Sequence, residues 1–154
     1  MSAVEARLAA LGHTVPAAPK PAATYVPTVQ VGDIIHVAGQ VPLRDGQFRW
    51  VGKVGRDFDL DQAREAATEV ALNFLAQLKV ALDGDLDRVV RIVKLGGFVN
   101  CTEDFTQQPQ VINAASELMV AAFGEAGRHA RSAVGVACLP FGVAVEIDGI
   151  VQVR

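Results

Sequence analysis

Apolar residues recur every three or four positions in two long stretches of the chain, and this spacing predicts two amphipathic helices. The first stretch runs from Ala63 to Leu82 and stops at Asp83-Gly84, a pair typical of a helix end. The second runs from Pro109 to Phe123, and Gly124 would end it. Both stretches are long enough to cover one face of a sheet.

A third, shorter helix is predicted at the start of the chain. Ser2 and Glu5 have the spacing of a capping box, in which two side chains bond the first free backbone N–H groups of a helix. Gly12 would end this helix. The following segment, PAAPKPAAT, is rich in proline and reads as an extended arm. We therefore expect residues 1–24 to form a helix and an arm.

Short runs rich in β-branched and aromatic residues predict strands around the helices. Five runs precede the last quarter of the chain: Tyr25–Val31, Ile34–Ala38, Gln40–Leu43, Gln47–Val51 and Arg88–Val99. Gly32-Asp33 lies between the first and second runs, and Asp45-Gly46 lies between the third and fourth. Both dipeptides are typical of hairpin turns. The sequence thus predicts two hairpins and one long strand.

The last quarter of the chain reads as two apolar strands around Leu139-Pro140-Phe141-Gly142. In the second strand, Glu146 alternates with valine and isoleucine, so it is expected on the face turned away from the helices. A simple hairpin would place Arg131 opposite about position 150, four residues beyond Glu146. Within one chain, Arg131 and Glu146 therefore need not touch.

The order of the elements favours one α+β domain that spans residues 1–154. Strands interspersed with only two long helices indicate a mixed sheet with both helices on one face. The length is that of a single domain, and the sequence has no internal repeat.

Composition excludes several classes of protein. Apolar residues make up 51% of the chain, which disfavours disorder, and a mean hydropathy of +0.28 favours an oligomer that hides apolar surface. The 14 Lys and Arg are scattered and the net charge is −3, so nucleic acid is not an expected partner. The sequence shows no signal peptide, no run of about 18 apolar residues and no disulfide pattern, so we expect a cytoplasmic protein that spans no membrane.

Residues typical of metal and nucleophile sites lack the spacing that such sites need. The three histidines are His13, His36 and His129. They are spread along the chain, and no CxxC, HxxxH or phosphate-loop motif exists, so no metal site is expected. Ser116 and Ser132 have no neighbouring partner in the sequence. Cys138 is interpreted as a buried strand cysteine.

Several short motifs, taken together, resemble one known family. Arg131-Ser132-x-Val134-x-Val136, Leu139-Pro140 and Val145-Glu146-Ile147 resemble the C-terminal signature of the YjgF-like, or Rid (reactive intermediate deaminase), family. Four other pieces agree in order: Tyr25, Ala38-Gly39-Gln40-Val41-Pro42, Gly97-Phe98-Val99 and Asn113-Ala114. The resemblance spans residues 25 to 153, and the N-terminal extension marks a longer branch.

The resemblance implies a chorismate-mutase-like α+β fold with a mixed six-stranded sheet. It also implies a homotrimer with a ligand cleft at each subunit interface. Members of the best-known branch hydrolyse reactive enamines and imines of 2-keto acids to the keto acid and ammonia, without a cofactor or metal. The implied ligand is therefore a small imine or keto acid that carries a carboxylate.

The same resemblance implies roles for individual residues. Arg131 would clamp the substrate carboxylate with two parallel hydrogen bonds. Glu146 would position a water molecule or relay a proton to the leaving nitrogen. The other implied substrate contacts are Tyr25, Gly39, Asn113 and Ala133.

Two departures from the family pattern leave alternatives open. Ala38 replaces a hydroxyl residue commonly found before Gly39, and Ala133 stands where many members have cysteine. By spacing alone, Arg131 and Glu146 also fit solvated strand residues. The alternative functions are a non-catalytic trimer that binds small carboxylates or acts as a sensor or chaperone, and a ribonuclease, against which the missing basic stripe weighs.

Overall fold

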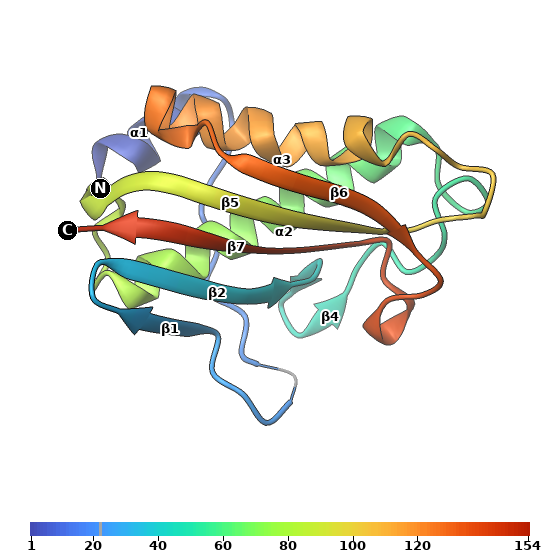
Figure 1. Ribbon diagram of the computed structural model, residues 1–154, viewed down its shortest axis with the longest axis horizontal. Helices are drawn as coiled ribbons and strands as arrows, with labels where there is room; N and C mark the ends of the chain where they lie inside the picture. Colours follow the sequence, from blue (N-terminus) through green and yellow to red (C-terminus); the bar gives the residue numbers. More distant parts are fainter. Residues whose placement is uncertain (22) are drawn as a thin grey trace.

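The computed structural model describes residues 1–21 and 23–154 and forms two layers, a sheet and a pair of long helices (Figure 1). The helices are α1 (Ala3–Ala10), α2 (Leu60–Ala81) and α3 (Gln108–Phe123). The strands are β1 (Thr28–Val31), β2 (Ile34–Gln40), β3 (Leu43–Arg44), β4 (Gln47–Phe48), β5 (Val89–Asn100), β6 (Ala130–Val136) and β7 (Val145–Val153). Three 3₁₀ turns, Leu86–Arg88, Gly124–Gly127 and Pro140–Gly142, complete the described elements.

The main sheet is mixed and has five strands in the order β1-β2-β7-β5-β6. Only the β5–β6 pair is parallel; the other neighbours are antiparallel. The expected α+β architecture is confirmed, but the count of six strands is wrong. β3 and β4 form a separate two-stranded sheet, because the ladder between β2 and β7 shifts register between Val37 and Gln40 and Pro42 has no N–H to extend it.

The last two strands do not pair with each other as they would in a simple hairpin. β5 lies between β6 and β7 and pairs with both of them. β6 follows α3 and runs parallel to β5, so β5, α3 and β6 form a crossover unit of the kind that parallel strands require. The segment Leu139–Gly142 therefore carries the chain past β5: it contains a turn, closed by a bond from the Gly142 N–H to the Leu139 carbonyl at 3.0 Å, but it does not join paired strands.

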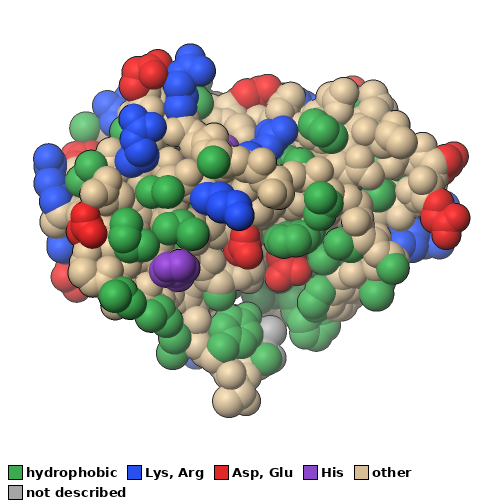
Figure 2. Space-filling model, viewed as in Figure 1, with side chains coloured by type: hydrophobic (Ala, Val, Ile, Leu, Met, Phe, Trp, Pro, Cys, Tyr) green, Lys and Arg blue, Asp and Glu red, His purple; other side chains and the backbone are tan. Residues whose placement is uncertain are grey.

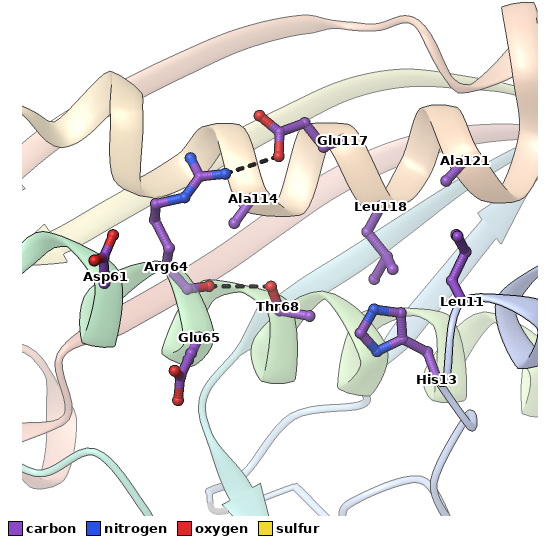
Figure 3. A pocket seen from close by; sticks show the side chains of 10 residues that line it. All are labelled: Leu11, His13, Asp61, Arg64, Glu65, Thr68, Ala114, Glu117, Leu118 and Ala121. Atoms are coloured by element: carbon purple, nitrogen blue, oxygen red, sulfur yellow. Dashed lines mark hydrogen bonds and ion pairs between the residues drawn. The ribbon is translucent and has the colours of Figure 1, made fainter.

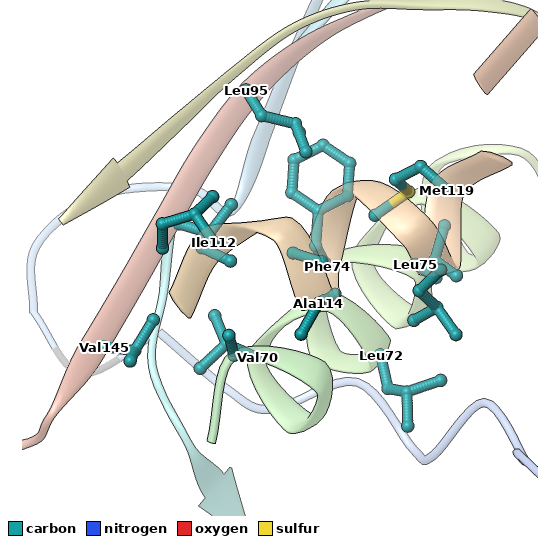
Figure 4. Packing of buried hydrophobic residues seen from close by; sticks show 14 of the residues in the cluster. Val70, Leu72, Phe74, Leu75, Leu95, Ile112, Ala114, Met119 and Val145 are labelled. Atoms are coloured by element: carbon teal, nitrogen blue, oxygen red, sulfur yellow. The ribbon is translucent and has the colours of Figure 1, made fainter. Parts of the chain in front are cut away.

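The core fills the space between α2, α3 and the sheet. Phe74 of α2 points toward Leu95 of β5, and Ile112 and Met119 of α3 pack beside it (Figure 4). All four side chains are fully buried. The apolar stripes that predicted the two helices are thus the faces that they turn to the sheet. No helix in residues 1–21 and 23–154 is long and apolar enough to cross a membrane.

The N-terminal helix is fixed at its first turn by carboxylates. Ser2 and Glu5 form the predicted capping box. The Asp87 carboxylate accepts further bonds from the backbone N–H groups of Ala3 and Val4, at 2.8 and 3.0 Å. These bonds lower the pKa of Asp87. Helix α1 is therefore joined to the 3₁₀ turn that precedes β5.

The other face of the sheet has no helix over it and is turned to the viewer in Figure 2. Residues in register share a face, so Glu146 of β7, Phe98 of β5 and Val134 of β6 form one row on this open face. Val29 and Val134 are about half exposed there. Many hydrophobic side chains lie on this face (Figure 2). The register of β7 and its alternating burial confirm the predicted orientation of Glu146.

Candidate functional site

Glu146 lies beside an open pocket of about 460 Å³ on the open face of the sheet. The pocket is lined by Ala23, Tyr25, Ala38, Gly39, Val41, Pro140, Phe141 and Glu146. Four segments contribute: the arm before β1, the end of β2, the turn before β7, and β7 itself. Three of the residues expected at the site, Tyr25, Gly39 and Glu146, thus line one pocket.

The Glu146 carboxylate lies directly against the backbone of Gly39. A Cβ atom at position 39 would collide with Oε1 of Glu146. The same arrangement recurs two residues along β7, where a Cβ at Gly96 would collide with Oδ1 of Asp148. Each carboxylate therefore occupies space that a neighbouring strand leaves free by having glycine. Gly39 is needed for the position of the Glu146 head group.

The end of β2, which carries Gly39, is held from the core side by two buried amides. Nε2 of Gln40 donates to the carbonyl of Ala38 at 3.0 Å. Oε1 of Gln40 accepts from Nε2 of Gln77 on α2 at 3.3 Å, and Gln77 also donates to the carbonyl of Pro19 at 2.6 Å. Because buried amides that satisfy one another are rigid, this chain fixes the pocket wall to both α2 and the arm.

Glu146 has the electrostatics of a proton-transfer group. The carboxylate is half-buried, and among residues 1–21 and 23–154 it receives no hydrogen bond. Burial raises the pKa of Glu146, and the negative charge of Asp148 raises it further. A carboxyl group with a raised pKa accepts and returns a proton more readily near neutral pH than an ordinary glutamate does.

Arg131 lies on the opposite face of the same sheet. Its Nη1 donates to Oδ1 of Asn113 at 2.9 Å and to Oγ of Ser116 at 3.1 Å, and its Nη2 donates to the carbonyl of Pro109 at 3.4 Å. All three partners belong to α3, which covers the core face. Within one chain, Arg131 and Glu146 are therefore on different faces and are separated by β5.

A series of hydrogen bonds through Ser116 and His129 orients Arg131. Ser116 is 2.9 Å from Nε2 of His129, and Nδ1 of His129 is 2.6 Å from the carbonyl of Gly127. Because a carbonyl only accepts, Nδ1 carries a proton, and a neutral ring then accepts the Ser116 hydroxyl proton at Nε2. Burial lowers the pKa of His129, as does the charge of Arg131, while the Gly127 carbonyl opposes this shift. The neutral ring thus orients Ser116 toward Arg131.

Sequence reasoning missed the pairing of Ser116 with His129. The two residues are 13 positions apart, across the end of α3, and no motif has that spacing. The available signal was that His129 precedes Arg131 by two residues, which puts both on one side of an extended chain.

The guanidinium of Arg131 keeps one edge free. Both Nη1 hydrogens are used by Asn113 and Ser116, whereas Nε–H has no partner in the described part of the chain. Nε–H and the second Nη2 hydrogen form the fork that binds a carboxylate in two parallel bonds. Since β6 is an edge strand, this fork is reachable from beyond the sheet. Ala133, two residues along β6, packs partly against the core and does not line the Glu146 pocket.

The remaining candidate residues have structural or surface positions. Cys138 is exposed in the segment after β6, so its interpretation as a buried strand cysteine is wrong; Cys101 is the buried one. The reason is that β6 already ends at Val136. Among residues 1–21 and 23–154, no group of three or more His, Cys, Asp or Glu is placed to hold a metal ion.

A second groove, of about 450 Å³, lies between α2 and α3 on the outer side of the helices (Figure 3). Two of its charged groups satisfy each other, since Nη2 of Arg64 bonds Oε2 of Glu117 at 2.8 Å. None of the residues expected at the site lines it. The Glu146 pocket and the Arg131 fork are therefore the places where site residues gather.

The two-layer α+β fold agrees with the comparisons with known proteins. A family model described as "YjgF/chorismate mutase-like, putative endoribonuclease" matches residues 5–147. The chain belongs to this family.

Individual relatives are similar over almost the whole chain. Protein TCP17 of Trypanosoma cruzi is 48% identical over 152 residues, which cover 98% of this chain and 94% of TCP17. The 2-iminobutanoate/2-iminopropanoate deaminase of Dermatophagoides farinae is 29% identical over 139 residues, covering 90% of this chain and 93% of that protein. The crystal structure of Atu1372 from Agrobacterium tumefaciens, a protein of unknown function, has a TM-score of 0.93 at 47% identity and covers 99% of this chain and 93% of that one.

Proposed function

We propose that this chain hydrolyses the C=N bond of 2-imino acids to 2-keto acids and ammonia, in sites formed between copies of the chain. The observation that carries this proposal is the pairing of a half-buried Glu146, whose pKa is raised, with an apolar pocket. The similarity to a 2-iminobutanoate/2-iminopropanoate deaminase supports it.

The positions of Arg131 and Glu146 make a second copy part of the proposal. The Arg131 fork lies at an edge strand, and Glu146 lies on the open face. A copy that lays its β6 edge across the open face of its neighbour brings a fork to each Glu146 pocket. Exposed valines on that face, such as Val29 and Val134, favour such a contact. Because the contact joins two different surfaces, it repeats from copy to copy and forms a ring when the rotation between copies closes; the family resemblance favours a ring of three.

The reaction follows from these positions. Arg131 of one copy holds the substrate carboxylate and fixes the imine carbon near Glu146 of the neighbour. Water attacks the protonated imine: the Glu146 carboxylate takes a proton from the water as the water oxygen bonds to that carbon, and the C=N π electrons move to nitrogen. This gives a neutral tetrahedral carbon that bears hydroxyl and amino groups. Glu146 then returns the proton to the amino nitrogen, the C–N bond breaks and its electron pair leaves with ammonia, and the hydroxyl proton passes to the Glu146 carboxylate as the C=O bond forms; release of that proton to ammonia regenerates the carboxylate.

The test is ammonia release from imines generated in place from several amino acids. Glu146→Gln keeps the shape of the side chain but cannot take up a proton, so turnover should fall by about 10²-fold or more. Asp148→Asn is the matched control, since Asp148 lies two residues along the same face. It should retain turnover and, by removing the charge that raises the Glu146 pKa, should move the acid limb of the pH profile lower. Equal turnover in wild type and Glu146→Gln would refute the role of Glu146.

The second candidate is a trimer that binds small carboxylates without turnover. Ala38 favours it, because this position offers the pocket no hydroxyl group for chemistry. Absence of ammonia release above the buffer rate, together with calorimetric binding of keto acids, would establish this alternative.

A further inference from the structure

We infer that the site is selective for 2-imino acids with large apolar side chains, above all aromatic ones. This inference rests on the proposed function and concerns the part of the pocket beyond Glu146. It assigns the substrate side chain to the space between Tyr25, Val41 and Phe141.

The chemistry of the walls favours an apolar group. Among the described lining residues, Glu146 is the one charged side chain. The others are alanines, a valine and a proline, with the rings of Tyr25 and Phe141 and the backbone of Gly39. Apart from the Glu146 carboxylate, the Tyr25 hydroxyl is the one polar side-chain group among these residues. A polar substrate side chain would therefore lose water there and gain few partners, whereas an apolar one has no hydrogen bonds to lose.

One wall is an aromatic stack in an unusual backbone conformation. The rings of Phe141 and Phe48 are stacked, with centroids 4.0 Å apart and planes 15° from parallel. Phe141 has a φ of 60°, which large residues rarely adopt, and it remains 55% exposed. An exposed ring that is held in a strained turn and stabilised by a second ring is better explained by a ligand contact than by the core.

The size of the pocket agrees with a large side chain. Its volume of about 460 Å³ lies within the range of roughly 300–1,000 Å³ that is typical of small-molecule sites. Ala38 and Ala23 keep the walls short, so a methyl side chain would leave most of this space to water. An aromatic ring would instead contact Phe141 on its face and displace that water.

The experiment compares imines generated in place from phenylalanine, leucine and alanine. For the wild type, kcat/KM should be at least about tenfold higher for the phenylalanine imine than for the alanine imine, with leucine between them. Phe141→Asn removes the ring but keeps a residue that tolerates the left-handed conformation. It should lower kcat/KM for the phenylalanine imine about tenfold and change that for the alanine imine less than about twofold. Val80→Asn, at an exposed position of α2 outside this pocket, is the control and should change neither.

The outcomes separate this inference from the proposed function. Turnover that is fastest with the alanine imine, or equal loss for both imines in Phe141→Asn, would overturn the inference and leave imine hydrolysis standing. If no imine is hydrolysed, the proposed function fails, and calorimetry with phenylpyruvate and pyruvate then tests the pocket. Tighter binding of phenylpyruvate that is lost in Phe141→Asn would support the side-chain selectivity; equal binding would overturn it.

Discussion

Replacing Arg131 by lysine keeps the positive charge and removes the fork. In the structure, Asn113 and Ser116 hold one end of the guanidinium, while Nε–H and one Nη2 hydrogen remain for a ligand carboxylate. A lysine ammonium cannot keep both anchors and also make two parallel bonds. The variant should therefore lose one charge-assisted hydrogen bond, which is worth about 1.5–3 kcal/mol. This corresponds to a Kd for a keto acid that is about 10- to 150-fold weaker.

The assay is calorimetric titration of wild type and Arg131→Lys with 2-oxobutyrate. Arg128→Lys is the matched control, because Arg128 lies three residues earlier and pairs with exposed Glu125 at 2.9 Å. The control should bind like the wild type, and all three proteins should have the same mass in solution. Unchanged affinity in Arg131→Lys, or the same loss in Arg128→Lys, would refute the assignment of the clamp.

Three further changes test other parts of the structure. Gly39→Ala places a Cβ against the Glu146 carboxylate and should lower turnover about tenfold or more with little change in Tm; full activity would show that this close approach is not needed. Glu146→Gln should be more stable than the wild type at pH 7, because the pKa of Glu146 is raised in the folded state, so its ionisation lowers the free energy of unfolding as pH rises past the pKa of the unfolded chain. The difference in stability between the two proteins should vanish below about pH 4. A wild type that is more stable than Glu146→Gln at pH 7 would contradict this. Asp87→Ala should destabilise α1 by about 1–2 kcal/mol at neutral pH, measured by amide hydrogen exchange of residues 3–10. This loss of stability should disappear as pH falls through the lowered pKa of Asp87. Amide protection in the variant equal to that of the wild type at pH 7 would contradict the prediction.

The sequence predicted the elements that local periodicity determines. Helix α2 repeats its apolar stripe over 22 residues, long enough for the pattern to outweigh single exceptions. In β7, buried and partly exposed positions alternate from Val145 to Val153. The face on which Glu146 lies could therefore be predicted from the two-residue periodicity of a strand alone.

Sequence periodicity could not predict which strands pair. β6 and β7 are consecutive strands, yet β5 lies between them, because α3 returns the chain in the direction of β5. The faces of the sheet on which Arg131 and Glu146 lie depend on this strand order. In a direct hairpin, β6 and β7 would instead have been neighbouring strands. The hydrogen bonds from Arg131 to Ser116 and from Ser116 to His129 could not be predicted for the same reason, since they join α3 to the start of β6.

The most direct test of a site shared between copies is complementation between two inactive variants. Light scattering should first show a mass of about 49 kDa, three times the 16.3 kDa of the chain. Arg131→Ala and Glu146→Gln are then unfolded, mixed in equal amounts, refolded and assayed for ammonia release. If each site takes Arg131 from one copy and Glu146 from its neighbour, about a quarter of the sites in the mixture are intact, and about a quarter of wild-type activity should return. Activity no higher than that of the separate variants, from a mixture that assembles normally, would contradict the shared site.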